Sequence, residues 1–139
     1  MSEKLHLELV TPYRVLLEKQ VDSVTLPGIE GELGILPEHI PLLTTLDTGI
    51  LSYSFQGKTN TVAVHWGYAQ VEGNSVRVLA ELAETSSEID LPRAKEAEKK
   101  AKENLISTAH SDDWREEENR QNKYESKLKR SIVRQAVAQ

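Results

Sequence analysis

The feature that most constrains this chain is a change in the spacing of its apolar residues near Ser86–Asp90. Before this point apolar and polar residues alternate over short runs, which is typical of half-buried β-strands. After it, apolar residues recur every three or four positions, the spacing of an amphipathic helix. All seven glycines lie at or before Gly73. We therefore expect the 139 residues to form two parts, residues 1–86 and residues 87–139.

The first part contains several short alternating runs separated by turn residues. They include 5–9, 50–55, 61–68 and 76–80, and the whole part predicts about eight to ten strands. Within the third run, Val62, Val64, Trp66 and Tyr68 are expected to share one face. Strands at hairpin spacing favour an antiparallel β-sandwich or flattened barrel.

The stretch from Leu26 to Gly49 interrupts this pattern with three prolines and with glycines spaced three residues apart. Glycine favours sharp turns, and proline disfavours a regular helix and a central strand. We therefore expect an ordered surface loop that presents carboxylates. Two interpretations stay open: a compact connecting loop that His39 orders by hydrogen bonding, or a partner contact made through Glu32.

The second part predicts an antiparallel hairpin of two helices. The first helix follows Asp90, a suitable N-cap, and its apolar stripe is Leu91, Ala94, Ala97, Ala101 and Leu105. A polar break at 107–113 follows, where Asp113 with Glu116 forms a capping-box variant. The second helix has Trp114, Tyr124, Leu128, Ile132 and Ala136 on roughly one side. Because alanines bury little apolar surface, we expect the hairpin to be weakly held.

Composition argues against several classes of function. There is no cysteine, so no disulfide or thiolate chemistry is expected, and the four histidines lack the spacing of a metal site. No nucleophile motif or paired acids stand out, so the chain is not expected to be an enzyme on its own. The net charge of −5 argues against nucleic-acid binding. No signal peptide or membrane span is apparent, which predicts a soluble cytosolic protein.

The second helix ends in a basic segment. Its cations are Lys123, Lys127, Lys129, Arg130 and Arg134, and Glu125 is the one acid among them. Such a run is either a solvated helix face or a surface that binds carboxylates or phosphates.

Four blocks of this sequence resemble one family. The opening LxLVTP, the stretch GIEGELGILPEHIPLLTTLDTG, the segment WGYAQVEGNSVRVLAELAE and the motif IDLPRA are similar to the epsilon subunit of bacterial F-type, proton-transporting ATP synthases. The resemblance covers nearly the whole chain in order. It implies a non-catalytic central-stalk rotor subunit, peripheral on the cytoplasmic face of the bacterial plasma membrane, that couples proton-driven ring rotation to ATP synthesis.

The resemblance also implies partners and a regulatory role. The sandwich would bind the gamma subunit and the membrane-embedded ring, with Glu32 at the ring-contact position and His39 on the same edge. The hairpin would either fold down beside the sandwich or extend along gamma. Extended, its basic residues would meet acidic segments of the alpha and beta subunits and inhibit ATP hydrolysis.

ATP is implied as a regulatory ligand, although no cofactor is required. In some bacterial members ATP binds the folded hairpin through an I/L-D-x-x-R-A motif, which 89–94 matches. The residues carried over are Glu84, Asp90, Arg93, Ala94, Arg130 and Arg134, with Lys100 where thermophilic members place an arginine. The alternative is that Asp90 only caps a helix and Arg93 is a surface residue.

A second class of function fits the pattern without the resemblance. The chain would then be a free-standing ligand-binding β-sandwich whose helices serve as a dimerisation arm. Co-purification with gamma and the catalytic subunits would separate the two classes.

Overall fold

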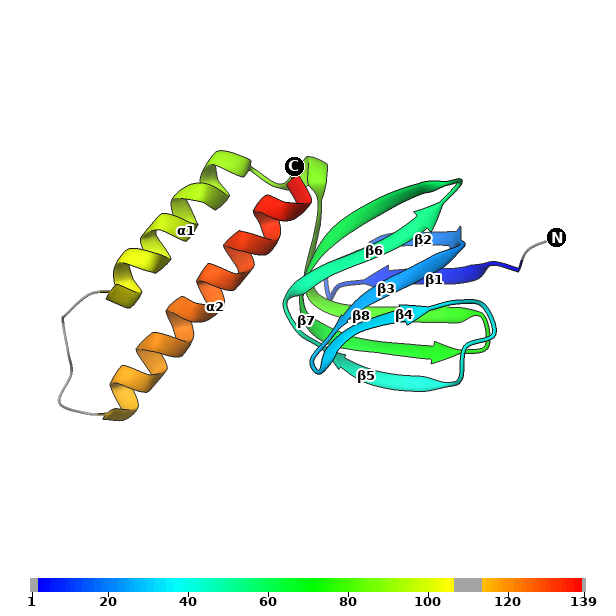
Figure 1. Cartoon of the computed structure of the whole chain (residues 1–139), viewed down its shortest axis with the longest axis horizontal. Coiled ribbons are helices and arrows are strands. Elements are labelled where there is room, and N and C mark those ends of the chain that lie inside the picture. Colours follow the sequence, from blue (N-terminus) through cyan, green and yellow to red (C-terminus); the bar gives the residue numbers. More distant parts are fainter. Residues whose placement is uncertain (1–2, 107–113, 139) are drawn as a thin grey trace.

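The computed structural model describes residues 3–106 and 114–138, which form a β-sandwich followed by a helical hairpin (Figure 1). This confirms the predicted fold class. The strands are β1 (Leu5–Val10), β2 (Val15–Val21), β3 (Ser23–Gly28), β4 (Gly31–Ile35), β5 (Leu42–Leu46), β6 (Gly49–Phe55), β7 (Lys58–Glu72) and β8 (Ser75–Thr85). The helices are η1 (Ser86–Glu88), α1 (Leu91–Ile106) and α2 (Trp114–Ala138).

The strands pair in the order β2-β1-β8-β7-β5-β3-β4, and β6 pairs with both β3 and β7. Strands β1 and β8 run parallel, whereas the other pairs are antiparallel as predicted. No hairpin joins β1 to β8, because they come from opposite ends of this part of the chain, so a parallel arrangement is open to them. The core comes from alternate positions of most strands, including Leu5, Leu7, Leu9, Leu26, Leu46, Leu51, Val76 and Val78.

The stretch from Leu26 to Gly49 is not one loop, contrary to the expectation. It contains the end of β3 and all of β4 and β5. Pro27 lies inside β3 opposite Glu32, and its carbonyl accepts the backbone N–H of Asp47 at 2.9 Å. A proline has no backbone N–H, but its carbonyl oxygen can still accept a hydrogen bond in a sheet.

The alternation along β7 reverses at Trp66, which corrects the predicted face. Val62 and Val64 join the core, whereas Trp66 and Tyr68 are exposed. Trp66 has a positive φ of 61°, so the strand turns over and the odd-numbered residues point into the core beyond it. The first half of β7 pairs with β6 and the second half with β5, so this reversal lies where the strand passes from one partner to the other.

The helical hairpin forms as predicted, with one difference in its buried face. In α1 the buried residues are Ala94 and Ala101, both on the predicted stripe. In α2 the buried residues are Ser131 and Val137, whereas Trp114, Ile132 and Ala136 of the predicted stripe are exposed. A small serine at a buried position allows close approach of neighbouring elements. The predicted cap at Asp113 lies outside the described residues.

Helix α2 lies between α1 and the sandwich (Figure 1). Its contacts with the sandwich involve β6, β7 and β8, and it also contacts η1. Two residues of β7, Ala63 and His65, are buried although their side chains alternate with the core residues Val62 and Val64. They therefore point to the outer face of the sheet, where α2 packs.

Candidate functional site

A cavity of about 320 Å³ lies where the sandwich meets the hairpin. It forms here because β8 ends in the short helix η1 and the chain then turns into α1. Asp90 caps the start of α1, since its Oδ1 accepts the backbone N–H of Arg93 at 3.1 Å. The lining residues are Glu84, Glu88, Ile89, Asp90, Arg93, Ala94, Ala97 and Arg134.

Most of the residues predicted to bind ATP lie around this one cavity. Glu84 comes from β8, Asp90, Arg93 and Ala94 from the start of α1, and Arg134 from the last turns of α2. The other two, Lys100 and Arg130, do not line it. The structure thus brings together five predicted residues that are up to 50 positions apart in sequence.

Glu84 is the most strongly perturbed acid of the cavity. Its Oε1 accepts the Nε–H of Arg134 at 2.7 Å, and it lies 3.0 Å from Nε2 of His65. Because an ionised carboxylate only accepts hydrogen bonds, Nε2 is the donor. The hydrogen bond from His65, followed by burial acting the other way and by Arg134, lowers the pKa of Glu84 to about 2. The carboxylate is therefore charged at any physiological pH.

Glu88 is held at the rim of the cavity. Its side chain accepts the Thr85 hydroxyl at 2.8 Å and a guanidinium N–H of Arg14 at 2.5 Å. The hydrogen bond from Thr85, then that from Arg14, lowers the pKa of Glu88. Arg93 has no side-chain hydrogen bond or ion pair to the described residues. The cavity thus offers a free guanidinium for an anionic group, beside carboxylates that accept from amino groups.

The ring-contact residues predicted from the resemblance belong to the edge strand β4 and the segment after it. Glu32 is exposed, lies opposite Pro27, and lines a hollow of about 520 Å³ together with residues 28–33 and 42–45. His39 follows the other end of β4, where its Nδ1 lies 2.7 Å from the carbonyl oxygen of Ile40. This contact is local, because it joins consecutive residues of the chain. The exposed side chains of Ile29 and Leu43 line the same hollow as Glu32, and the exposed Leu36 and Ile40 lie within three residues of His39 in the chain.

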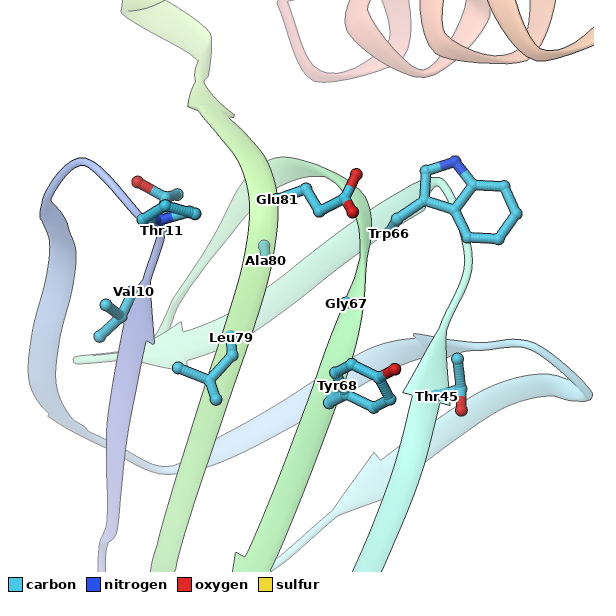
Figure 2. Close-up of a pocket in the computed structure, with 10 residues that line it drawn as sticks. Val10, Thr11, Thr45, Trp66, Gly67, Tyr68, Leu79, Ala80 and Glu81 are labelled. Atoms are coloured by element: carbon cyan, nitrogen blue, oxygen red, sulfur yellow. The ribbon is translucent and has the colours of Figure 1, made fainter. Parts of the chain in front are cut away.

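Sequence reasoning missed an apolar face on the sandwich. Val10, Leu79, Tyr68 and Thr45 lie in register on the adjacent strands β1, β8, β7 and β5, and they form a row in Figure 2. Tyr68 is 59% exposed and Leu79 51%, and with Trp66 they line a groove of about 470 Å³. Gly67, inside an alternating run, was the signal: an isolated glycine in a strand often marks an irregular backbone.

The basic segment of α2 is partly engaged with the sandwich. Lys129 forms an ion pair with Asp47, which lies between β5 and β6, and this hydrogen bond lowers the pKa of Asp47. Arg134 binds Glu84 as described above. Lys123 and Lys127 lie 5.7 and 5.5 Å from the ring centre of Tyr124, within cation–π range. The segment is therefore neither a purely solvated face nor wholly available to a partner.

Two further kinds of site are not found in the described residues. Among residues 3–106 and 114–138, no group of three or more His, Asp or Glu side chains could hold a metal ion. No helix in the described part of the chain combines the length and the apolar composition needed to cross a membrane.

The fold defines a β-sandwich domain that carries a docked two-helix hairpin. Residues 4–86 match the family model of the ATP synthase delta/epsilon chain β-sandwich domain. The ATP synthase epsilon chain of Geotalea uraniireducens is 45% identical over 139 residues, which covers 99% of this chain and 96% of that one. The epsilon chain of Carboxydothermus hydrogenoformans is 51% identical over 105 residues, covering 76% of this chain and 78% of that one. The chain belongs to the ATP synthase delta/epsilon chain family.

Solved structures share the fold. A chain in the cryo-EM structure of the Euglena gracilis mitochondrial ATP synthase, OSCP/F1/c-ring, matches with a TM-score of 0.83 and 22% identity. The match covers 100% of this chain and 84% of that one. A chain in the central stalk/c-ring structure of the Tetrahymena thermophila mitochondrial ATP synthase matches with a TM-score of 0.58 and 16% identity.

Proposed function

We propose that this chain is a non-catalytic central-stalk rotor subunit of an F-type ATP synthase. The observation that carries the proposal is the 45% identity to the Geotalea uraniireducens epsilon chain, which extends over the sandwich and both helices. In this role the chain couples proton-driven ring rotation to ATP synthesis. It is a peripheral protein on the cytoplasmic face of the bacterial plasma membrane.

The gamma subunit binds the apolar face formed by Trp66, Tyr68 and Leu79. Large exposed aromatic and aliphatic side chains in one groove are typical of a protein interface, where aromatic anchors provide much of the affinity. Glu81 lines the same groove and provides a charged group beside the apolar ones. An interface with an apolar centre and a polar rim is the common arrangement in stable complexes.

The membrane ring binds the edge formed by Glu32, His39 and their apolar neighbours. An exposed carboxylate suits basic or amide groups on the polar loops of the ring. Glu32 has no hydrogen bond or ion pair within the described residues, so it is available to a partner. Its role is to transmit torque by contact and not to transfer protons.

The hairpin regulates ATP hydrolysis. When it extends, its basic residues Lys123, Lys127, Lys129, Arg130 and Arg134 meet acidic segments of the alpha and beta subunits. The buried residues of α2 are Ser131 and Val137, which bury little apolar surface, and this supports an element that can detach.

A second candidate function is the binding of ATP in the cavity between the sandwich and the hairpin. The specific support is that Glu84, Asp90, Arg93, Ala94 and Arg134 line one hollow of a size common for small-molecule sites. Arg93 and the unused Nη groups of Arg134 would receive phosphates, and the carboxylates would receive an amino group. Bound ATP would favour the folded hairpin to the extent that it prefers that state.

Co-purification tests the rotor role. A tagged chain expressed in its own cells is expected to bring down gamma, ring and catalytic subunits from solubilised membranes. Glu32→Ala is expected to reduce the ring subunits and Trp66→Ser the gamma subunit, whereas Glu103→Ala on the exposed side of α1 should change neither. Each purified variant should keep the parent's unfolding curve. Recovery of the chain without any of these subunits would favour the free-standing sandwich.

Calorimetric titration tests the nucleotide site. ATP, with Mg²⁺ and without, is expected to give saturable heat with the isolated chain. Arg93→Ala should abolish it, and Lys95→Ala, which is exposed on α1 and does not line the cavity, is the matched control. Absence of heat at millimolar ATP would refute nucleotide binding and would leave the rotor role unaffected.

A further inference from the structure

Two ion pairs cross the contact between α2 and the sandwich. Along its whole length α2 has two buried residues, Ser131 and Val137, which together bury little apolar surface. Across the same contact, Arg134 binds Glu84 of β8 and Lys129 binds Asp47 between β5 and β6. These pairs join positions 50 and 82 residues apart, so they exist only while the hairpin is docked.

In the Arg134–Glu84 pair, the carboxylate of Glu84 is also bound by His65. His65 is 2% exposed and its Nε2 donates to the same carboxylate oxygen that receives Arg134. The other ring nitrogen, Nδ1, is buried and has no partner among the described residues. The polar contact that His65 makes is thus the one to Glu84. A carboxylate already fixed by one donor loses less conformational freedom when a second donor arrives.

The pair itself is largely shielded from water. The side chains of Glu84 and Arg134 are 21% and 27% exposed, which is less than for Lys129 at 50%. An ion pair at this depth is screened less by salt than one on the open surface. The lowered pKa of Glu84 is consistent with a carboxylate that its surroundings keep charged.

We propose that Glu84, positioned by the buried His65, is a built-in receptor for Arg134 that locks the hairpin onto the sandwich without any bound ligand. The internal carboxylate occupies the Nε–H of Arg134, a cation that would otherwise meet an anionic partner. The lock deepens the proposed regulatory role, because the hairpin must release Arg134 from Glu84 before Arg134 can reach another subunit. The lock consists of contacts within this one chain, so it can form without other subunits.

The chain offers a direct probe of docking because it contains no cysteine. Ala63 is fully buried on the outer face of β7, beneath α2, and Ala69 is fully buried in the core. In the variant Ala63→Cys, the rate of alkylation by iodoacetamide reports how often the hairpin lifts. In Ala69→Cys the same rate reports opening of the sandwich. When opening and closing are fast, each rate is proportional to the open population.

The experiment measures these rates without nucleotide in full-length chains carrying Glu84→Gln, Arg134→Gln or both. Each single change is expected to speed alkylation at position 63 about fivefold to tenfold, the loss of one partly shielded charged hydrogen bond. The double variant should be no faster than the faster single one, because both changes remove one interaction. The rate at position 69 should not change. Glu103→Gln and Lys95→Gln, exposed on α1, are the matched charge controls.

A second pair of variants tests the positioning role of His65. His65→Gln keeps an N–H donor and is expected to stay closer to the parent rate at position 63 than His65→Leu, which has none. Parent-like rates at position 63 in both Glu84→Gln and Arg134→Gln would overturn the lock. So would multiplying effects in the double variant, since the two residues would then act independently. Neither result would bear on co-purification with the synthase, so this proposal and the rotor role fail separately.

Discussion

Gly67 is the residue whose replacement tests the architecture of the apolar face most sharply. It lies in β7 next to Trp66 and pairs with Ala80 of β8. A Cβ built at position 67 would lie 2.1 Å from the carbonyl oxygen of Leu79 and 2.9 Å from the Cα of Ala80. Both are backbone atoms of the neighbouring strand, so no side-chain rotation relieves the overlap. Gly67→Ala therefore requires β7 and β8 to separate locally.

The expected cost combines two effects. Overpacking in a well-packed region costs about 1–3 kcal/mol, and loss of a strand hydrogen bond costs about 1 kcal/mol. We expect Gly67→Ala to lower the free energy of unfolding by about 3 kcal/mol, which corresponds to a fall in Tm of roughly 10 °C for a chain of this size. Urea unfolding followed by far-UV circular dichroism measures the first quantity, and calorimetry the second.

Gly34 in β4 provides the control. A Cβ added there would meet nothing within 4 Å, and its φ is not in the left-handed region. Gly34→Ala is expected to change stability by no more than about 0.5–1 kcal/mol, with stabilisation as the favoured sign because alanine restricts the unfolded chain. If Gly67→Ala unfolded within 1 kcal/mol of the parent, the steric account of the β7–β8 contact would be refuted.

Three other outcomes are expected. Asp90→Ala should cost about 1 kcal/mol of stability in urea unfolding because the backbone N–H of Arg93 loses its cap; an unchanged midpoint would contradict the capping role. The lowered pKa of Glu84 means that its stabilisation is present above its unfolded-state value of 4.5 and is lost as the pH falls toward 2. The parent should therefore lose about 2–3 kcal/mol more than Glu84→Gln between pH 6 and pH 2, and equal losses in urea titrations would argue against the buried pair. Arg14→Gln removes an exposed ion pair with Glu88 and should change stability by less than about 0.5 kcal/mol, so a larger shift in thermal unfolding would indicate a structural role for this pair.

The cavity beneath the hairpin was accessible to sequence reasoning only in part. The motif at 89–94 identified Asp90, Arg93 and Ala94, which are close in sequence and lie on one helical turn. Arg134 was noted as part of the basic segment, but only the resemblance placed it with Asp90 and Arg93, because it lies on the other helix. His65 was overlooked, since a histidine among apolar residues carries no spacing signal, and its role depends on the cross-strand neighbour of Glu84.

The face of Trp66 and Tyr68 was predicted wrongly because of the backbone conformation of one residue. Strict alternation places Trp66 and Tyr68 on the same face as Val62 and Val64. The parts of β7 before and after Trp66 each alternate regularly when taken separately. The left-handed conformation at Trp66 exchanges the two faces of the strand, and a pattern rule assumes that no such exchange occurs. Pro27 also could not be placed from the sequence pattern. A proline fits a strand where the neighbouring strand requires no backbone N–H from it, and that depends on the strand pairing.

By itself, the sequence determined the two-part organisation, the β-sandwich, the helical hairpin and the N-cap at Asp90. These depend on local periodicity and local hydrogen bonding, which are properties of short segments. The tertiary structure alone decided the parallel β1–β8 pair, the exposed Trp66 face and the docking of Arg134 onto Glu84. Each of these depends on contacts between residues far apart in the chain. Their geometry follows from the packing of whole elements, which no short segment encodes.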